Sequence, residues 1–186
     1  MRKRLFIALL FAVILSQNAC GNSESTDARM TKIQAAISAA SKITAVADIR
    51  ADYADRVYDF QVRFTGTEAA GEIAIQKPES LAGVTVRVSD NGAKLIYDGA
   101  ELETGELGND LSPVGIIPML INEWKKGFTD FTVKEKHGML TMSTTLPGGA
   151  IQKTWFEDEN NLPKRTEVVA SGRTVLTVEF YDVIYE

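Results

Sequence analysis

The sequence predicts an α+β protein in which one antiparallel sheet of about ten strands packs against two helices. Apolar and polar residues alternate with a period of two along most of the chain after residue 57, which is typical of strands with one buried face. Short turns rich in Gly, Asn and Pro separate these segments and favour an antiparallel meander. The length of 186 residues, with 45% hydrophobic and 24% charged residues, fits one globular domain and excludes wholesale disorder or a multi-pass membrane protein.

The chain begins with a segment typical of protein export. A basic stretch at residues 1–4 precedes eleven consecutive apolar residues at 5–15. As a helix these would rise only about 16 Å, too little for a hydrocarbon core of about 30 Å, so a signal peptide is predicted over residues 1–19. Ala19 directly precedes Cys20, and this junction resembles a bacterial lipoprotein signal, although Gln17 stands where such signals usually have Leu.

Two interpretations of Cys20 follow. In the first, Cys20 is lipidated, residues 20–27 are the lipidated Cys and a flexible tether, and residues 28–186 form the single folded domain. In the second, Cys20 is an unpaired thiol left after a signal cut elsewhere. A lone Cys has no disulfide partner in an exported chain, which favours lipidation.

Charge and composition narrow the function classes. The leader holds three of the 20 Lys and Arg and no acid, so residues 20–186 carry 17 bases and 25 acids, a net charge of −8. Such a surface repels nucleic acid and anionic headgroups, so we predict no nucleic-acid partner. Attachment to the extracytoplasmic face of the cell membrane would come from acyl chains on Cys20. With one Cys and one His, the sequence predicts no metal and no cofactor.

The first element of the domain is predicted to be an amphipathic helix over residues 27–47, with Thr26 or Asp27 as its N-cap. Apolar side chains recur there at steps of three and four: Met30, Ile33, Ile37, Ala40, and then Ile43 or Thr44. The abundant Ala also favours helix.

Strands are predicted to follow. In the first half they centre on residues 58–64, 73–75, 84–88, 94–98 and 101–106, with tight turns at Asn91-Gly92 and Asp98-Gly99. A second helix is predicted to open at Ser112-Pro113, or at Pro118, and to stop at Gly127. The remaining strands centre on residues 131–133, 140–142, 151–156, 164–170 and 175–185.

Few residues could carry chemistry. His137 precedes Gly138 in a predicted turn and has no visible partner as base or ligand. The acidic segment 157–161 could hold Ca²⁺ through oxygen ligands, but it lacks the spacing and central Gly of a calcium loop, so a solvated turn is favoured. Nucleophile motifs and phosphate-binding glycine loops are absent. The sequence therefore predicts no catalytic residue, and the chain is not predicted to be an enzyme.

The order of elements and four short cues resemble a known superfamily. The cues are Lys77-Pro78 after a strand, the hairpin VSDNGAKLIYDG, Ser112-Pro113 before a helix, and Leu162-Pro163 after the strand containing Trp155. Together they resemble the lipoprotein carrier and lipoprotein-sorting superfamily (LolA/LolB-like), in particular its Gram-positive membrane lipoprotein branch, which includes the spore germination lipoprotein. The resemblance implies a strongly curved antiparallel sheet, an incomplete β-barrel, with helices covering its concave face. Carrier members hold acyl chains in that cavity, and no catalytic residues are known for the fold class.

Two functions are weighed on this basis. A non-catalytic module would bind a cell-envelope protein through an exposed edge or loop, and its apolar face would be a closed core. A carrier or receptor would use the same face to hold lipid acyl chains or lipoproteins. The residues of this acyl-binding or core face are Tyr58, Phe60, Val62, Phe64, Val84, Val86, Ile117, Leu120 and Ile121.

Overall fold

The computed structural model describes residues 25–89, 92–105, 111–113, 115–126, 131–136, 139–146 and 148–186, with the backbone alone at 131–136. Within these ranges the chain forms two α-helices, one short 3₁₀ helix and one sheet of eleven antiparallel strands. The helices are α2 (Thr26–Ala39) and α3 (Ile116–Lys126), and the 3₁₀ helix η2 covers Glu79–Leu81. The strands are β1 (Ile43–Asp52), β2 (Val57–Gly66), β3 (Gly71–Lys77), β4 (Thr85–Ser89), β5 (Gly92–Tyr97), β6 (Ala100–Gly105), β7 (Phe131–Lys136), β8 (Met139–Thr145), β9 (Ile151–Glu157), β10 (Pro163–Ala170) and β11 (Arg173–Tyr185).

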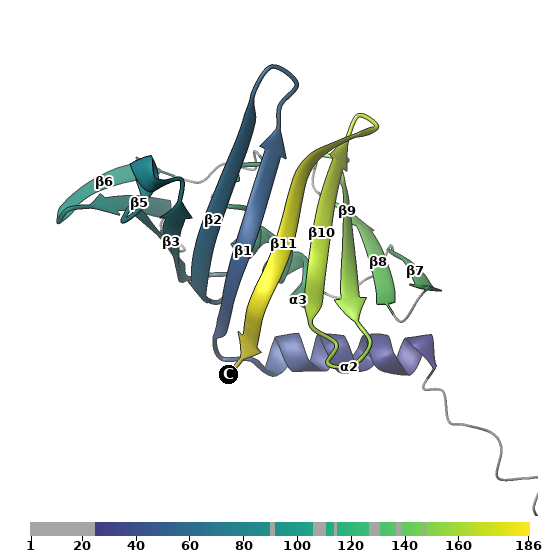
Figure 1. The fold of residues 1–186 in the computed structure, drawn as a ribbon. Coiled ribbons are helices and arrows are strands. Elements are labelled where there is room, and N and C mark those ends of the chain that lie inside the picture. The colour runs from purple at the N-terminus through teal and green to yellow at the C-terminus, as the bar shows by residue number, and fades with distance from the viewer. Residues whose placement is uncertain are drawn as a thin grey trace, which may run out of the picture.

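The sheet is a double meander joined at its centre. Its strand order is β6-β5-β4-β3-β2-β1-β11-β10-β9-β8-β7, so the first and last strands pair with each other. We call β1–β6 the N-terminal wing and β7–β11 the C-terminal wing. The edge strands β6 and β7 are not paired with one another, so the sheet is open. Figure 1 shows β5 and β6 lying at a large angle to β1 and β2.

The helix prediction was wrong beyond residue 39. Helix α2 ends at Ala39, and residues 43–52 form β1, a strand that was not predicted. Ala fits either structure, and the steps of three and four that suggested a helix overlap here with a strand whose alternate residues are all buried: Ile43, Ala45, Ala47, Ile49 and Ala51. The N-cap is Ser25, whose Oγ accepts a hydrogen bond from the Ala28 amide at 3.2 Å.

Helix α3 begins at Ile116, which is later than the predicted start at Ser112-Pro113. Pro118 is its third residue, where the backbone N–H that Pro lacks has no partner within the helix in any case. Its side chains Leu120, Ile121 and Trp124 are at most 1% exposed. Lys125 and Lys126 lie in its last turn, where they suit the negative end of the helix dipole.

The two helices take different places on the sheet. Helix α3 packs on one face of the sheet, which we call the inner face. There the centroid of the Trp124 ring lies 5.9 Å from that of Phe156 on β9 and 5.6 Å from that of Phe180 on β11. Helix α2 lies across the ends of the C-terminal strands (Figure 1). The opposite face, the outer face, carries no helix of the described residues. The predicted strands are present, and the turn predicted at Asp98-Gly99 has positive φ at both positions, as two-residue hairpins of type I′ require; the turn at Ser171-Gly172 has the same feature.

A candidate binding surface on the outer face

The residues predicted as the acyl-binding or core face lie in the interior or at its rim. Val62, Phe64, Ile117, Leu120 and Ile121 are at most 1% exposed and belong to one hydrophobic cluster. The other members are less enclosed: Val84 and Val86 are 8% and 5% exposed, Phe60 is half-buried and Tyr58 is 39% exposed. The structure therefore brings most of this set together around α3 and leaves its first member open to solvent.

A polar cluster interrupts the inner face of the C-terminal wing. The Thr154 hydroxyl accepts hydrogen bonds from Trp124 Nε1 at 3.2 Å and from Gln152 Nε2 at 3.3 Å, and lies 2.9 Å from the Thr166 hydroxyl. Gln152, Thr154 and Thr166 are each at most 1% exposed. Sequence reasoning missed this cluster because Thr is common on exposed strand faces. The signal was its place, since Thr154 precedes the buried Phe156 by two residues.

A buried arginine holds α2 against the sheet. Arg29 Nε donates to Asn161 Oδ1 at 2.8 Å, its Nη2 donates to the Glu157 carbonyl at 2.7 Å, and its Nη1 forms an ion pair with Asp158. The acidic segment 157–161, predicted as a solvated turn or a Ca²⁺ loop, thus contains the groups that receive Arg29. Among the described residues no group of three or more His, Cys, Asp or Glu is placed to hold a metal ion.

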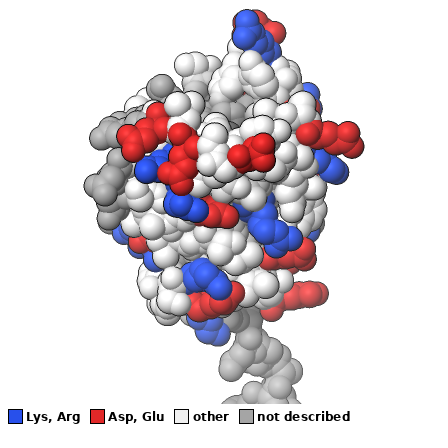
Figure 2. Space-filling model, turned by 90° about the vertical axis from the view of Figure 1, so that its left-hand side faces the viewer, with Lys and Arg blue, Asp and Glu red and all other residues white. Residues whose placement is uncertain are grey.

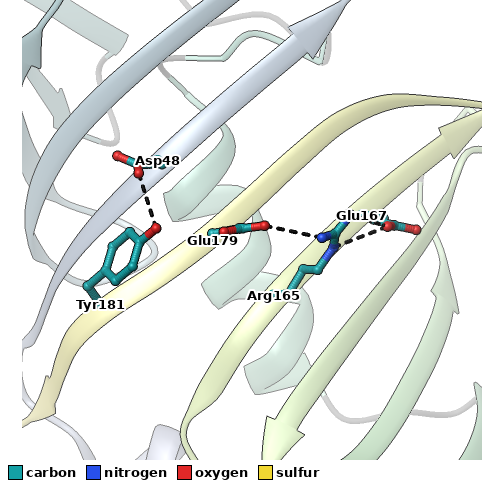
Figure 3. A network of polar contacts seen from close by, with 5 residues as sticks. All are labelled: Asp48, Arg165, Glu167, Glu179 and Tyr181. Carbon is teal, nitrogen blue, oxygen red and sulfur yellow. Dashed lines mark hydrogen bonds and ion pairs between the residues drawn. The ribbon is translucent and has the colours of Figure 1, made fainter.

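Polar side chains form a continuous row across the outer face. Register pairs Lys77 on β3 with Gln61, Gln61 with Asp48, Asp48 with Glu179, and Glu179 with Arg165 on β10. Directly paired residues project from the same side of a sheet and lie about 5 Å apart. The sheet therefore places two acidic residues, Asp48 and Glu179, on neighbouring strands at its centre, and the Glu179 carboxylate turns toward Arg165 (Figure 3).

Arg165 neutralises part of this charge. Its Nη1 donates to Glu179 Oε1 at 3.1 Å, and its Nη2 donates to Glu167 Oε1 at 2.7 Å (Figure 3). Asp48 instead accepts hydrogen bonds from two neutral donors, Gln61 Nε2 at 2.9 Å and the Tyr181 hydroxyl at 3.1 Å. The hydrogen bond to Asp48 raises the pKa of Tyr181 above its ordinary value, with smaller contributions from burial and the charges of Asp48 and Glu179.

Two adjoining depressions lie along this row. The larger one, of about 450 Å³, is lined by Asp48, Ile49, Arg50, Asp59, Phe60, Gln61, Lys77, Arg165, Thr177 and Glu179. The smaller one, of about 230 Å³, is lined by Met139, Trp155, Lys164, Arg165 and Glu179. Arg165 and Glu179 belong to both, so we treat the two as one outer groove. Trp155 projects outward between the buried Thr154 and Phe156, and Lys153 Nζ lies 4.4 Å from its ring centroid.

The side of the molecule at β3, β5 and β6 differs from the outer groove. Figure 2 shows basic and acidic residues interspersed there among uncharged ones. Arg87 pairs with Glu72 at 3.6 Å, and Lys94 pairs with Glu101 and Glu103 at 3.6 and 3.4 Å. Charges of both signs near a sheet edge oppose pairing with another strand and favour solvation. The outer groove also holds charges of both signs, but it is hollowed and exposes Trp155, so it is the better candidate for recognising another molecule.

Several predictions fall on residues outside the described ranges: the signal peptide at 1–19, the lipidated Cys20, Asn91 of the predicted Asn91-Gly92 turn, the helix stop at Gly127 and the turn residue His137. In the described part of the chain, no helix combines the length and apolarity that crossing a bilayer would need.

Comparisons with known proteins bear on the fold. No family model matches the sequence, and no curated protein matches it significantly. Among solved structures, the complex of the CwlD amidase from Clostridioides difficile with the GerS lipoprotein matches with a TM-score of 0.51 and 15% identity, over 89% of this chain and 98% of the matched chain. An uncharacterized conserved protein from Thermus thermophilus matches with a TM-score of 0.51 and 11% identity, over 88% of each chain.

A LolA superfamily protein from Nitrosomonas europaea gives a TM-score of 0.48 and 12% identity, over 88% of this chain and 94% of that one. At such low identity these likenesses concern the fold alone. They show that the overall fold is shared with a chain of the CwlD–GerS complex and with the Thermus thermophilus protein.

Proposed function

We propose that this chain is an extracytoplasmic lipoprotein whose folded domain is a non-catalytic binding module of the cell envelope. Residues 1–19 would be removed as a signal peptide, and acyl chains on Cys20 would anchor the mature chain to the cell membrane. Helix α2 begins at Thr26, and its cap is Ser25. Residues 20–25 would then span about 20 Å at most, which keeps the domain close to the bilayer.

The packing of the inner face favours an interaction module over a carrier. Val62 and Phe64 on β2 and Leu120 on α3 are fully buried among other protein atoms. An acyl chain could enter here only if these side chains moved apart, because protein interiors are close-packed. This filled inner face is the observation that carries the proposal. The partner would then bind elsewhere, and the outer groove is the candidate surface.

The similarity in fold agrees with this role. The GerS lipoprotein is found in a complex with an amidase, CwlD. We propose that the present chain likewise binds a protein of the cell envelope. We also propose that its sheet is the incomplete barrel of the lipoprotein carriers, with α3 on the concave side and α2 closing one end.

One observation favours a second candidate function, a carrier of lipid acyl chains. The inner face of the N-terminal wing opens toward its edge, where Leu95 is half-buried and Leu102 is 63% exposed. Tyr58 and Phe60 stack at 6.4 Å between ring centroids at another part of this rim. An acyl chain would bind along these exposed apolar groups rather than in the filled centre.

In-cell photo-crosslinking separates the two candidates. A photoreactive phenylalanine analogue would replace Thr177 in the outer groove, Tyr58 at the open rim, or Arg87 on the charged side. The interaction module predicts a protein adduct of defined mass from Thr177 and none from Arg87. The carrier predicts a lipid adduct from Tyr58, and that result without any protein adduct would contradict the interaction module.

Anchoring is tested separately with Cys20→Ala. The wild-type protein should occur in the membrane fraction with a diacylglyceryl mass addition, whereas the variant should be released or remain unprocessed. A soluble wild-type protein without that added mass would contradict the lipoprotein assignment.

A further inference from the structure

We infer that the larger depression of the outer groove binds a small zwitterion about the length of a dipeptide, whose ammonium group pairs with Asp48 and whose carboxylate pairs with Lys77. This inference goes beyond the proposed function and does not depend on it, because it concerns a small molecule rather than a protein partner. It follows from three features of the depression, which are its size, the pairing of its charges and the distance between the two charges that stay unpaired.

The larger depression has the size of a small-molecule site. Its volume of about 450 Å³ lies within the 300–1,000 Å³ usual for such pockets. The residues that line it come from β1, β2, β3, β10 and β11, and each of these strands is paired on both sides. The spacing of their side chains is therefore set by the sheet before a ligand arrives, which lowers the cost of binding.

Most of the charged groups of the depression already have partners. Arg50 Nη1 donates to both carboxylate oxygens of Asp59, at 3.1 and 3.3 Å. Arg165 Nη1 donates to Glu179 Oε1 at 3.1 Å, and its Nη2 donates to Glu167 Oε1 at 2.7 Å (Figure 3). These groups neutralise one another, so they select neither a cationic nor an anionic ligand.

Two charges of opposite sign remain. Asp48 accepts hydrogen bonds only from neutral donors, Gln61 Nε2 at 2.9 Å and the Tyr181 hydroxyl at 3.1 Å. Lys77 on β3 lines the same depression and forms no ion pair with the described residues. A ligand with a single charge could pair with only one of them. A zwitterion would make a charge-assisted hydrogen bond with each.

The distance between these two residues sets the length of the ligand. Register places Gln61 between Asp48 and Lys77, so they lie two strand spacings apart, about 10 Å. A hydrogen bond of about 2.8 Å at each end leaves about 4 Å or more between the two charges of the ligand. In a single amino acid both charges sit on one Cα and lie closer than this. In a dipeptide they sit on Cα atoms that are about 3.8 Å apart, which fits the span.

Gln61 favours a ligand with a peptide group between its charges. Its Nε2 donates to Asp48, which leaves its Oε1 as an acceptor for the peptide N–H of a dipeptide. Thr177, which also lines the depression, offers a hydroxyl that can donate or accept. The site thus has a polar group for each part of a dipeptide backbone.

The test uses alanyl-alanine with free ends as probe, because its small side chains leave recognition to the charged ends. It is titrated into the purified, isotope-labelled mature protein in detergent micelles, and NMR spectra record the side-chain amide of Gln61. The signal should shift saturably with a Kd of about 10⁻³ M. Acetylation of the ammonium group, or amidation of the carboxylate, should each weaken binding by about fivefold or more, because a charge-assisted hydrogen bond is lost. Free alanine should also bind at least about fivefold more weakly, since its charges cannot reach both residues.

Variants of the protein assign each end of the ligand. Asp48→Asn should bind alanyl-alanine and its acetylated form alike, yet still prefer a free carboxylate to an amide. Lys77→Gln should show the converse, a preference for the free ammonium group alone. Unfolding would weaken all these ligands together and cannot produce either pattern. The matched controls Glu103→Gln on β6 and Lys94→Gln on β5 lie outside the groove and should leave every Kd unchanged.

The inference is overturned if free and blocked dipeptides bind equally, if no shift saturates below about 10 mM, or if Asp48→Asn and Lys77→Gln keep the wild-type preferences. Its failure differs from failure of the proposed function. A protein adduct from Thr177 without dipeptide binding would overturn only this inference. Dipeptide binding, together with a lipid adduct at Tyr58 and no protein adduct, would overturn only the interaction module.

Discussion

The two wings of the sheet bury their inner faces to different extents. In the N-terminal wing, the cross-strand row Phe64, Ile73, Val86, Leu95 and Leu102 is apolar throughout, and its exposure rises from 0% at Phe64 to 63% at Leu102. In the C-terminal wing, the row Val178, Thr166, Thr154 and Met142 stays at most 1% exposed, although two of its four members are polar.

The difference follows from where the helices contact the sheet. Trp124 of α3 packs on the C-terminal wing, and Arg29 ties α2 to the turn between β9 and β10. Contact of α3 with the N-terminal wing includes an ion pair, Lys125 with Glu68 at 2.8 Å, at the connection between β2 and β3. The C-terminal wing is thus fixed by directional polar contacts beneath the helices, whereas burial in the N-terminal wing declines toward its edge. Any rearrangement that admits a ligand to the inner face should therefore begin in the N-terminal wing.

Removing the Trp124 side chain should have the largest effect on this contrast. Trp124→Ala takes away a fully buried ring that contacts Phe156 and Phe180, and should lower the free energy of unfolding by about 3–5 kcal/mol. The matched change in the other wing, Leu102→Ala, removes a mostly exposed side chain and should stay within about 0.5 kcal/mol. Urea unfolding of both variants measures the difference, and equal losses would contradict the contrast between the wings.

Much of this arrangement could be predicted from sequence, but the contrast itself could not. Alternation with a period of two located β2 and the later strands, and Ile117, Leu120 and Ile121 marked the buried side of α3. The strand β1 was missed because Ala45, Ala47 and Ala51 fit helix and strand alike, and only pairing with β2 and β11 on both sides decides between them.

The site was harder to predict than the fold. Asp48, Glu179, Arg165 and Trp155 come from four strands, and strand order and register alone bring them into one row. The partners of Arg29 lie about 130 positions further along the chain. Such proximity leaves no trace in a single sequence, since local periodicity fixes which face a residue takes but not its neighbours across strands.

Substitution in the buried polar cluster of the C-terminal wing should cause the second-largest loss of stability. Thr154→Val keeps the shape of the side chain but removes the acceptor of Trp124 Nε1 and Gln152 Nε2. Leaving those buried donors without a partner should cost about 1–3 kcal/mol in chemical unfolding. Thr104→Val is the control in the N-terminal wing, because Thr104 is exposed and its hydroxyl makes a single part-buried hydrogen bond, to the Ala93 carbonyl, whose loss should cost less than about 1 kcal/mol. If Thr154→Val left the free energy of unfolding unchanged, the polar cluster would not contribute to holding α3 on the sheet.

The ion pair between Glu68 and Lys125 should make the free energy of unfolding depend on pH. The hydrogen bond from Lys125 lowers the pKa of Glu68 below its usual value, against a smaller opposing effect of burial. The pair therefore stabilises the fold above the unfolded-state pKa of about 4.5, and this contribution is lost as pH falls through the lower folded-state pKa. Glu68→Gln should cost about 0.5–1 kcal/mol at pH 7 and flatten the stability profile in the acid range.

The control for this pH dependence is Glu72→Gln, which removes a carboxylate that pairs with Arg87 at 3.6 Å on the solvated side. Its unfolding free energy should follow the wild-type pH profile. If Glu68→Gln gave the same profile as Glu72→Gln, Lys125 would not link α3 to the N-terminal wing.

The smallest effect is expected at the seam where the wings meet. Tyr185 on β11 pairs with Ile43 on β1, and its buried hydroxyl has no hydrogen-bond partner among the described residues. Burial raises the pKa of Tyr185 well above its ordinary value of 10.0. The neutral phenol is thus favoured in the folded state, and stability should fall as pH rises above about 10, where the unfolded chain ionises.

Tyr185→Phe removes the unpaired hydroxyl, and with it the loss of stability expected at alkaline pH. At pH 7 the free energy of unfolding should be unchanged or higher by up to about 1 kcal/mol, because no hydrogen bond is lost and no polar group remains to be desolvated. Above pH 10 the variant should retain stability that the wild type loses, whereas Tyr97→Phe, at a 54% exposed position on β5, should behave as the wild type at both pH values. A loss of more than about 1 kcal/mol for Tyr185→Phe at pH 7 would mean that its hydroxyl does have a partner. The seam would then be held by a polar contact of the kind found beneath α3, and the contrast between the wings would begin at β1 and β11 rather than further out.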